Sequence, residues 1–195
     1  RQAGPDELVY RVAGRGFRVR PTGFWQTHPE AAEVFTETVL AAAGLVEGER
    51  ALDLYAGAGL FTAALAGAVG AGGRVLGLEG DHQAVTAAAG NLAELAGAEV
   101  RRAAVSVASV AAAAAELGEL AVVVLDPPRT GAGVEVLTAI LDCRPRTVVY
   151  VACDPAALAR DLRVALDRGW QLAELTAFDA FPMTHHVECI ATLRR

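Results

Sequence analysis

A cysteine stands at the end of the unbroken apolar run of residues 148–151. Such a run is typical of an interior parallel strand buried on both faces. Asp154 is a suitable N-cap, and Pro155 a suitable first residue, for the helix that the following residues predict. We therefore expect Cys153 at the carboxyl edge of a sheet and over a positive helix terminus, where a thiolate is favoured. On this stretch alone, a reactive thiol and a buried structural cysteine both remain open.

A glycine turn, Tyr55-Ala56-Gly57-Ala58-Gly59-Leu60, separates a predicted strand from a predicted helix. Its glycines let the backbone approach a ligand that a Cβ atom would exclude. Glu79 ends the next predicted strand at the distance expected for an acid that binds ribose hydroxyls. Together these features predict a nucleoside-cofactor site. Because Thr62 takes the place of the third glycine of a dinucleotide motif, the pattern favours S-adenosylmethionine over a dinucleotide.

Two further stretches are predicted at the same edge of the sheet. Asp126-Pro127-Pro128-Arg129 follows a buried strand, and its prolines hold the chain extended and remove two N–H donors. Alone it is typical of an ordinary proline turn, but its placement favours a role in the site. Glu188 begins a strand that we expect to run opposite to the others, which brings its carboxylate to this edge. The neighbouring pair His185-His186 lacks companion ligands at metal spacing, so we predict no metal site.

The order of elements predicts the frame that holds these residues. From residue 50 strands alternate with helices, and the last two strands follow each other directly. This order predicts a Rossmann-like α/β fold with a mostly parallel sheet, helices on both faces and an antiparallel C-terminal strand. Residues 1–23 are assigned to an N-terminal hairpin, the remnant of a preceding domain, and residues 24–195 to one domain.

The segment between the hairpin and the first long helix contains two adjacent aromatic residues and a glutamine. Phe24 and Trp25 are expected to pack, whereas packing explains Gln26 less well. Thr27 and Glu30 are predicted to form a capping box for the helix that follows.

Composition narrows the classes of protein. The net charge of −6, from 17 basic and 23 acidic residues, argues against a nonspecific nucleic-acid coat. The first twenty residues are nevertheless locally positive, with five arginines against Asp6 and Glu7. Three cysteines without a C-x-x-C pair indicate neither a disulfide framework nor a zinc site and favour a reducing cytoplasm. We expect no membrane span and, since the chain starts at Arg1, a truncated protein.

In order along the chain, these motifs resemble the catalytic domain of the S-adenosylmethionine-dependent RNA 5-methyluridine methyltransferases, which act on uracil in tRNA or large-subunit rRNA. The glycine turn is generic to methyltransferases, whereas the cysteine segment and the C-terminal tail are far more specific. The matching segments are Phe24-Trp25-Gln26, residues 53–62, Asp126-Pro127-Pro128-Arg129-Thr130-Gly131, residues 150–155 and residues 181–188.

The resemblance implies a class I methyltransferase catalytic domain over residues 24–195. It implies that Cys153 is a nucleophile that adds to C6 of uracil and that Glu188 is the base that removes the C5 proton. It also implies an RNA substrate and a further RNA-binding domain outside this chain. We also expect a monomer. The residues that the resemblance places at the cofactor or substrate are Gln26, Tyr55, Leu60, Glu79 and Asp126, and the glycine turn adds Gly57 and Gly59 as expected cofactor-binding residues.

One departure from the family pattern has an expected consequence. Asp154 stands where the family usually has asparagine, and an added negative charge beside Cys153 should oppose formation of the thiolate.

Three other functions remain open. An amino-methyltransferase also carries Asp-Pro-Pro, although an aromatic residue normally follows where Arg129 stands. A non-catalytic module that binds the cofactor and RNA is consistent with Asp154 and the acidic charge. An NAD-dependent oxidoreductase is consistent with the glycine turn.

Overall fold

The computed structural model describes residues 6–181, 183–184 and 186–195, and within them seven strands form one central sheet. Pro182 and His185, and with them the prediction for the histidine pair, lie outside the described residues. The strands are β1 Leu8–Val12, β2 Arg15–Val19, β3 Arg50–Leu54, β4 Arg74–Glu79, β5 Ala98–Arg102, β6 Val122–Leu125, β7 Thr147–Ala152, β8 Gln171–Phe178 and β9 Glu188–Arg194. The helices are α1 Ala31–Ala43, α2 Leu60–Val69, α3 His82–Leu92, α4 Val107–Leu117, α5 Val134–Asp142 and α6 Pro155–Asp167.

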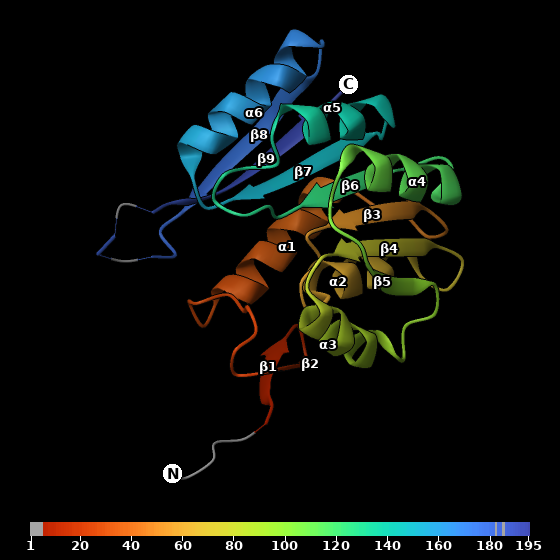
Figure 1. Ribbon diagram of the computed structural model, residues 1–195, viewed down its shortest axis with the longest axis vertical. Coiled ribbons are helices and arrows are strands. Elements are labelled where there is room, and N and C mark those ends of the chain that lie inside the picture. The colour runs from red at the N-terminus through yellow and green to blue at the C-terminus, as the bar shows by residue number, and fades with distance from the viewer. Residues whose placement is uncertain (1–5, 182, 185) are drawn as a thin grey trace.

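The sheet has the order β5-β4-β3-β6-β7-β9-β8 and helices on both faces (Figure 1). Its side chains alternate between two cores, because neighbouring residues of a strand point to opposite faces. Val122 and Val124 of β6 belong to the core under α1, α2 and α3, whereas Val123 and Leu125 belong to the core under α4, α5 and α6. The expected α/β fold is confirmed.

The C-terminal reversal lies one strand from the edge of the sheet. β9 runs antiparallel to both β7 and β8, between which it is inserted. Ala152 of β7 pairs with Cys189 of β9, so the next residues along the two strands are Cys153 and Glu188. The reversal therefore brings Glu188 to the edge where the parallel strands end, as predicted.

Local sequence explains most element boundaries. The Asp154 side chain accepts a hydrogen bond from the Ala157 N–H at 2.8 Å, and Pro155 is the first residue of α6, as predicted. The capping box predicted for α1 is wrong. The helix begins at Ala31 with no side-chain cap, because the ring and carbonyl of His28 accept the N–H groups of Glu30 and Ala31 in a preceding turn.

The N-terminal hairpin packs on the same core as the main sheet. Its turn places Ala13 and Gly14 at positive φ, as a tight two-residue hairpin requires. Val12 and Phe17 are buried in the core that α1, α2 and α3 share, and Figure 1 shows the hairpin beside α3. In the part of the chain that the structure describes, no helix combines the length and the apolar character that crossing a membrane requires.

Candidate active site

A cavity of about 610 Å³ opens at the edge where the parallel strands end. Its wall is formed by the loops that follow β3, β4, β6 and β7, together with the start of β9 and the segment before α1. Seven of the nine predicted site residues lie in that wall: Gln26, Tyr55, Gly57, Glu79, Asp126, Cys153 and Glu188.

Gly59 and Leu60, the other two predicted residues, lie behind the wall. Gly59 is the N-cap of α2 with φ of 87°, and a Cβ atom there would lie 3.4 Å from Ala88. Leu60 is buried in the core. Gly57 also has a positive φ but faces open space. Gly59 and Leu60 therefore set the course of the glycine turn, while Gly57 leaves room for a ligand.

Glu79 ties the glycine turn to the start of α3. One carboxylate oxygen accepts the Gly57 N–H at 2.9 Å, and the other accepts the Asp81 N–H at 2.7 Å. Each oxygen keeps a further acceptor position. The carboxylate thus combines a structural role with the capacity to accept hydrogen bonds from hydroxyls in the cavity.

A second acid lies buried beneath the same turn. Asp53 Oδ2 accepts the Thr62 hydroxyl at 2.6 Å, while Oδ1 has no hydrogen-bond partner among the described residues. Burial, which outweighs the Thr62 hydrogen bond, raises the pKa of Asp53 to about 7. Thr62, which stands in place of the third glycine of a dinucleotide motif, therefore links the start of α2 to Asp53 of β3 beneath the turn.

Cys153 and Glu188 bring a thiol and a carboxyl group to the same cavity. Burial raises the pKa of Glu188 to about 7, and only 3% of this residue is exposed. Burial also raises the pKa of Asp126 well above its ordinary value, with further contributions from the charges of Glu188 and Asp53. At neutral pH this edge of the sheet can therefore both hold and accept protons.

The acids that oppose ionisation of Cys153 differ from the one expected. Burial raises the pKa of the thiol, and the charges of Glu188 and Asp126 raise it further, whereas Arg129 lowers it. The expectation that Asp154 is the opposing acid is wrong. Its carboxylate is directed onto the start of α6, where it accepts the Ala157 N–H. Burial, the largest cause, also outweighs a backbone hydrogen bond at Cys153 that lowers the pKa of the thiol.

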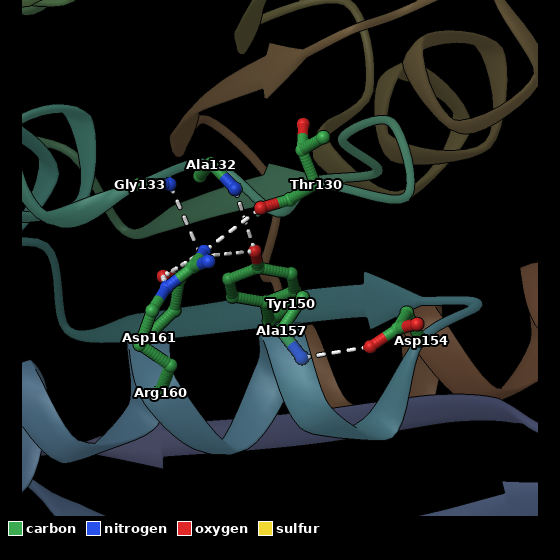
Figure 2. Close-up of polar contacts among 8 residues, drawn as sticks. All are labelled: Thr130, Ala132, Gly133, Tyr150, Asp154, Ala157, Arg160 and Asp161. Atoms are coloured by element: carbon green, nitrogen blue, oxygen red, sulfur yellow. Dashed lines mark hydrogen bonds and ion pairs between the residues drawn. The ribbon is translucent and has the colours of Figure 1, made fainter.

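A hydrogen-bond network fixes the loop after β6 to the loop that carries Cys153 (Figure 2). The hydroxyl of the fully buried Tyr150 accepts the Ala132 N–H at 2.8 Å and donates to Asp161 at 2.7 Å. Asp161 also accepts the Gly133 N–H at 3.1 Å. Since Tyr150 belongs to β7 and Asp161 to α6, both flanks of Cys153 hold the backbone of the neighbouring loop.

Arg160 completes this network at the surface. Its guanidinium donates to Asp161 and to the Thr130 carbonyl at 2.8 Å. Gly131 lies between these groups with φ of 78°, and a Cβ atom there would lie 2.6 Å from both Arg160 and Asp161. A side chain at position 131 would therefore disrupt the contacts that hold residues 130–133, which directly follow Arg129 of the cavity wall.

Several cavity residues were not predicted from the sequence. Phe24 is 71% exposed and lines the cavity, so its predicted packing is wrong, whereas Trp25 packs against Tyr10 with ring centroids 4.8 Å apart, as predicted. Arg129, in a stretch that was predicted at this edge but not itself among the predicted site residues, lines the cavity and contacts the ring of His186 at 2.7 Å. Further additions come from the end of the hairpin and the segment after it, from the glycine turn, from α3 and its N-cap, and from the tail: Val19, Arg20, Thr22, Gly23, Thr27, Ala58, Asp81, Gln83, Ala84, Ala87 and Phe181. For α3 the signal was present, because a helix that directly follows Glu79 begins at the ligand edge.

Comparison with known protein families identifies the family of this chain. A sequence model of the tRNA (uracil-5-)-methyltransferases matches residues 7–195. The chain belongs to this family. The resemblance seen in the motifs is therefore confirmed, and so is the fold that it implied.

Relatives and solved structures agree with this assignment. An uncharacterized RNA methyltransferase of Streptomyces avermitilis is 45% identical over 185 residues, which cover 94% of this chain and 42% of the relative. One of Streptomyces coelicolor is 46% identical over 96% of this chain and 43% of its own length. The crystal structure of Pyrococcus abyssi tRNA (uracil-54, C5)-methyltransferase in complex with S-adenosyl-L-homocysteine has a TM-score of 0.78 and 30% identity, over 98% of this chain and 45% of that one. The chain spans less than half the length of these proteins.

Proposed function

We propose that this chain is the catalytic part of an enzyme that transfers a methyl group from S-adenosylmethionine to C5 of a uridine in tRNA or rRNA. The observation that carries the proposal is the placement of Cys153 and Glu188 at adjacent ends of the neighbouring strands β7 and β9, at one cavity that the glycine turn and Glu79 also line. Family membership supports the reaction class.

The cavity fits the cofactor. Gly57 leaves open space at the glycine turn, Glu79 offers acceptors to ribose hydroxyls, and Ala84 and Ala87 supply an apolar wall for the adenine. Gln26, Tyr55 and Asp126 line the rest of the path toward Cys153. When bound, S-adenosylmethionine supplies an electrophilic methyl group on a sulfonium.

Uracil C5 is too weakly nucleophilic to take this methyl group directly. The thiolate of Cys153 adds to C6, which forms the S–C6 bond and moves the electron pair through C5 to the C4 oxygen. C5 then forms its bond to the methyl carbon as the methyl–sulfur bond breaks. Glu188 takes the proton from C5, and the electron pair released expels the Cys153 thiolate from C6.

Two groups of the cavity assist these steps. Arg129 lowers the pKa of Cys153 and so favours the thiolate. The pKa of Glu188 near 7 suits a base that accepts a proton and returns it to solvent in each cycle. The target uridine must leave any stack to reach the thiol, as for other enzymes that act on bases.

The remaining features of the proposal concern the whole protein. We assign residues 24–195 to the catalytic domain and residues 1–23 to the end of a preceding region that contributes a further RNA-binding domain. A reducing cytoplasm suits a catalytic thiol, and we propose a monomer.

Product analysis tests the reaction. Wild-type chain, S-adenosylmethionine and a uridine-containing RNA are expected to yield 5-methyluridine on nucleoside mass spectrometry, and Cys153→Ala and Glu188→Gln none. Cys189→Ala is the matched control, because Cys189 is a neighbouring buried cysteine that does not line the cavity. A methyl group on a ring nitrogen or an exocyclic amine would instead support an amino-methyltransferase and overturn the proposal.

A further inference from the structure

One face of the β1–β2 hairpin is turned away from the core and carries arginines. Cross-strand pairing places Val9 opposite Arg18 and Arg11 opposite Gly16 on this face. Phe17, which points the other way, is buried, whereas Val9 is 62% exposed and the Arg18 side chain 71% exposed. The alternation of a strand thus separates an apolar inner face from a basic outer face.

The basic face continues into the cavity described above. At the end of β2 the alternation continues, because Val19, its last residue, is buried, and the next residue, Arg20, is exposed and lines the cavity that contains Cys153. Arg11, Arg18 and Arg20 therefore form a row, here called the arginine row, that leads from the hairpin to the cavity. Two residues along a strand advance by about 6.6 Å, so Arg18 and Arg20 are separate contact points.

The charges of the arginine row are available to a partner. Among the described residues, Arg11 and Arg20 form no ion pair. Arg18 contacts Glu7 at 3.6 Å, and both side chains are largely exposed. Exposed pairs of this kind contribute little, so an anion can replace Glu7. The positive charge is local, since the whole chain carries −6.

The row is held in place relative to the glycine turn by one buried amide. Asn91 of α3 accepts the Arg18 N–H at 2.8 Å and donates to the Arg18 carbonyl at 3.1 Å. The same side chain donates to the Ala58 carbonyl, within the glycine turn, at 3.0 Å. The backbone under the row is therefore ordered before a partner binds, which reduces the entropy cost of association.

We propose that the arginine row binds the phosphate backbone of the RNA strand that enters the cavity, next to the target uridine. The inference rests on the proposed function, which supplies the RNA. Contacts to phosphate fix the register of a nucleic acid and supply much of its affinity without reading its sequence. Guanidinium groups match phosphate oxygens in a bidentate geometry, and Val9 offers an apolar contact between them.

Salt dependence of RNA binding tests the arginine row. Dissociation constants of this chain for a uridine-containing single-stranded RNA are measured by fluorescence anisotropy between about 50 and 200 mM salt. The test protein carries Arg11→Gln, Arg18→Gln and Arg20→Gln. The matched control carries Arg50→Gln, Arg144→Gln and Arg195→Gln, which remove the same charge at the opposite edge of the sheet.

The test protein is expected to bind the RNA more weakly. The slope of log association constant against log salt concentration should become shallower by about 2, since each phosphate contact to a single strand contributes about 0.7. The control is expected to keep the wild-type slope. Equal slopes for the test and control proteins would overturn the inference. Arg11→Gln alone, farthest from the cavity, guards against a folding defect and should lose about 0.7.

Two further outcomes separate this inference from the proposed function. A uridine-free RNA of equal length should lose affinity to the same extent, because phosphate contacts are independent of sequence. Loss confined to the uridine-containing RNA would contradict the arginine row. If the wild-type chain forms 5-methyluridine while the slopes are equal, only this inference fails. If the slopes differ but no 5-methyluridine forms, only the proposed function fails.

Discussion

Tyr150→Phe isolates the hydrogen bonds that fix the loop after β6. The change removes one fully buried hydroxyl, which donates to Asp161 at 2.7 Å and accepts the Ala132 N–H at 2.8 Å. A hydrogen bond to a charged group contributes about 1.5–3 kcal/mol, and a buried donor left unpaired costs about 1–3 kcal/mol. Because the two effects share one site and do not simply add, we expect the free energy of unfolding to fall by about 3 kcal/mol.

For a chain of this size, such a loss lowers the melting temperature by about 6–12 °C. Urea denaturation measures the free energy of unfolding. Thr36→Val is the control, since the equally buried Thr36 hydroxyl donates only to the Ala32 carbonyl within α1. We expect this control to lose about 1 kcal/mol.

Catalysis separates a positioning role from a merely structural one. Release of residues 130–133 displaces the adjacent Arg129 in the cavity wall, so single-turnover methyl transfer by Tyr150→Phe should slow by about tenfold to a hundredfold. The cofactor's Kd, measured by calorimetry well below the melting temperature, should stay within about twofold, because Glu79 and Gly57 lie in other loops and the Asp126 N–H is held by the Leu54 carbonyl of β3 at 3.2 Å. A wild-type rate of methyl transfer in a variant destabilised by about 3 kcal/mol would refute the positioning role.

Three further changes test individual parts of the site. Methyl transfer should rise as the pH passes through about 7, where Glu188 ionises, and a pH–rate profile without that rise would contradict its role as base. Because this pKa of about 7 lies above the ordinary value of 4.5, the contribution of Glu188 to the free energy of unfolding is full below about pH 4.5 and is lost as the pH rises through 7. Urea denaturation of the wild type and of Glu188→Gln across this pH range measures that contribution. Asn91→Ala removes three hydrogen bonds between the hairpin, α3 and the glycine turn, and should raise the cofactor's Kd about tenfold by calorimetry; an unchanged Kd would show that the turn keeps its shape alone. Glu79→Ala leaves the Gly57 N–H and the ribose hydroxyls without an acceptor and should raise the cofactor's Kd by about a hundredfold. Glu79→Gln should raise it by less, and equal effects of the two changes would refute the role of the carboxylate.

The convergence of Cys153 and Glu188 was predictable from the sequence for a simple reason. Parallel strands end at one edge of a sheet, so the residues after each strand meet there regardless of their separation in the chain. Glu188 required one more step, the recognition that two strands without a helix between them must reverse direction. The same logic brought Glu79 and Asp126 to the cavity.

Side-chain direction within the loops was not predictable in this way. Phe24 and Trp25 are adjacent and chemically alike, yet Trp25 stacks on Tyr10 while Phe24 faces the cavity. Which of the two packs against the core depends on the hairpin, whose docking on α3 no local pattern indicates. The hairpin's share of the cavity wall was missed for the same reason.

The charges that shift the pKa of Cys153 were not predictable from closeness in the sequence. Asp154 is adjacent in sequence, but as an N-cap it is directed onto the backbone of α6, so its charge is engaged there. Glu188 is far away in sequence but lies at the same cavity through strand pairing, and its charge raises the pKa of the thiol. Distance along the chain therefore does not indicate which of these two acids raises the pKa of the thiol.

A covalent complex with 5-fluorouridine RNA tests the central claim most directly. Fluorine at C5 cannot leave as a proton does, so once C5 is methylated the S–C6 bond cannot break by the normal route. We predict that the wild-type chain gains the mass of the methylated RNA in the presence of S-adenosylmethionine, and that digestion locates it on the peptide containing Cys153. A complex that forms equally with Cys153→Ala, or none with a wild-type chain that produces 5-methyluridine, would contradict the account.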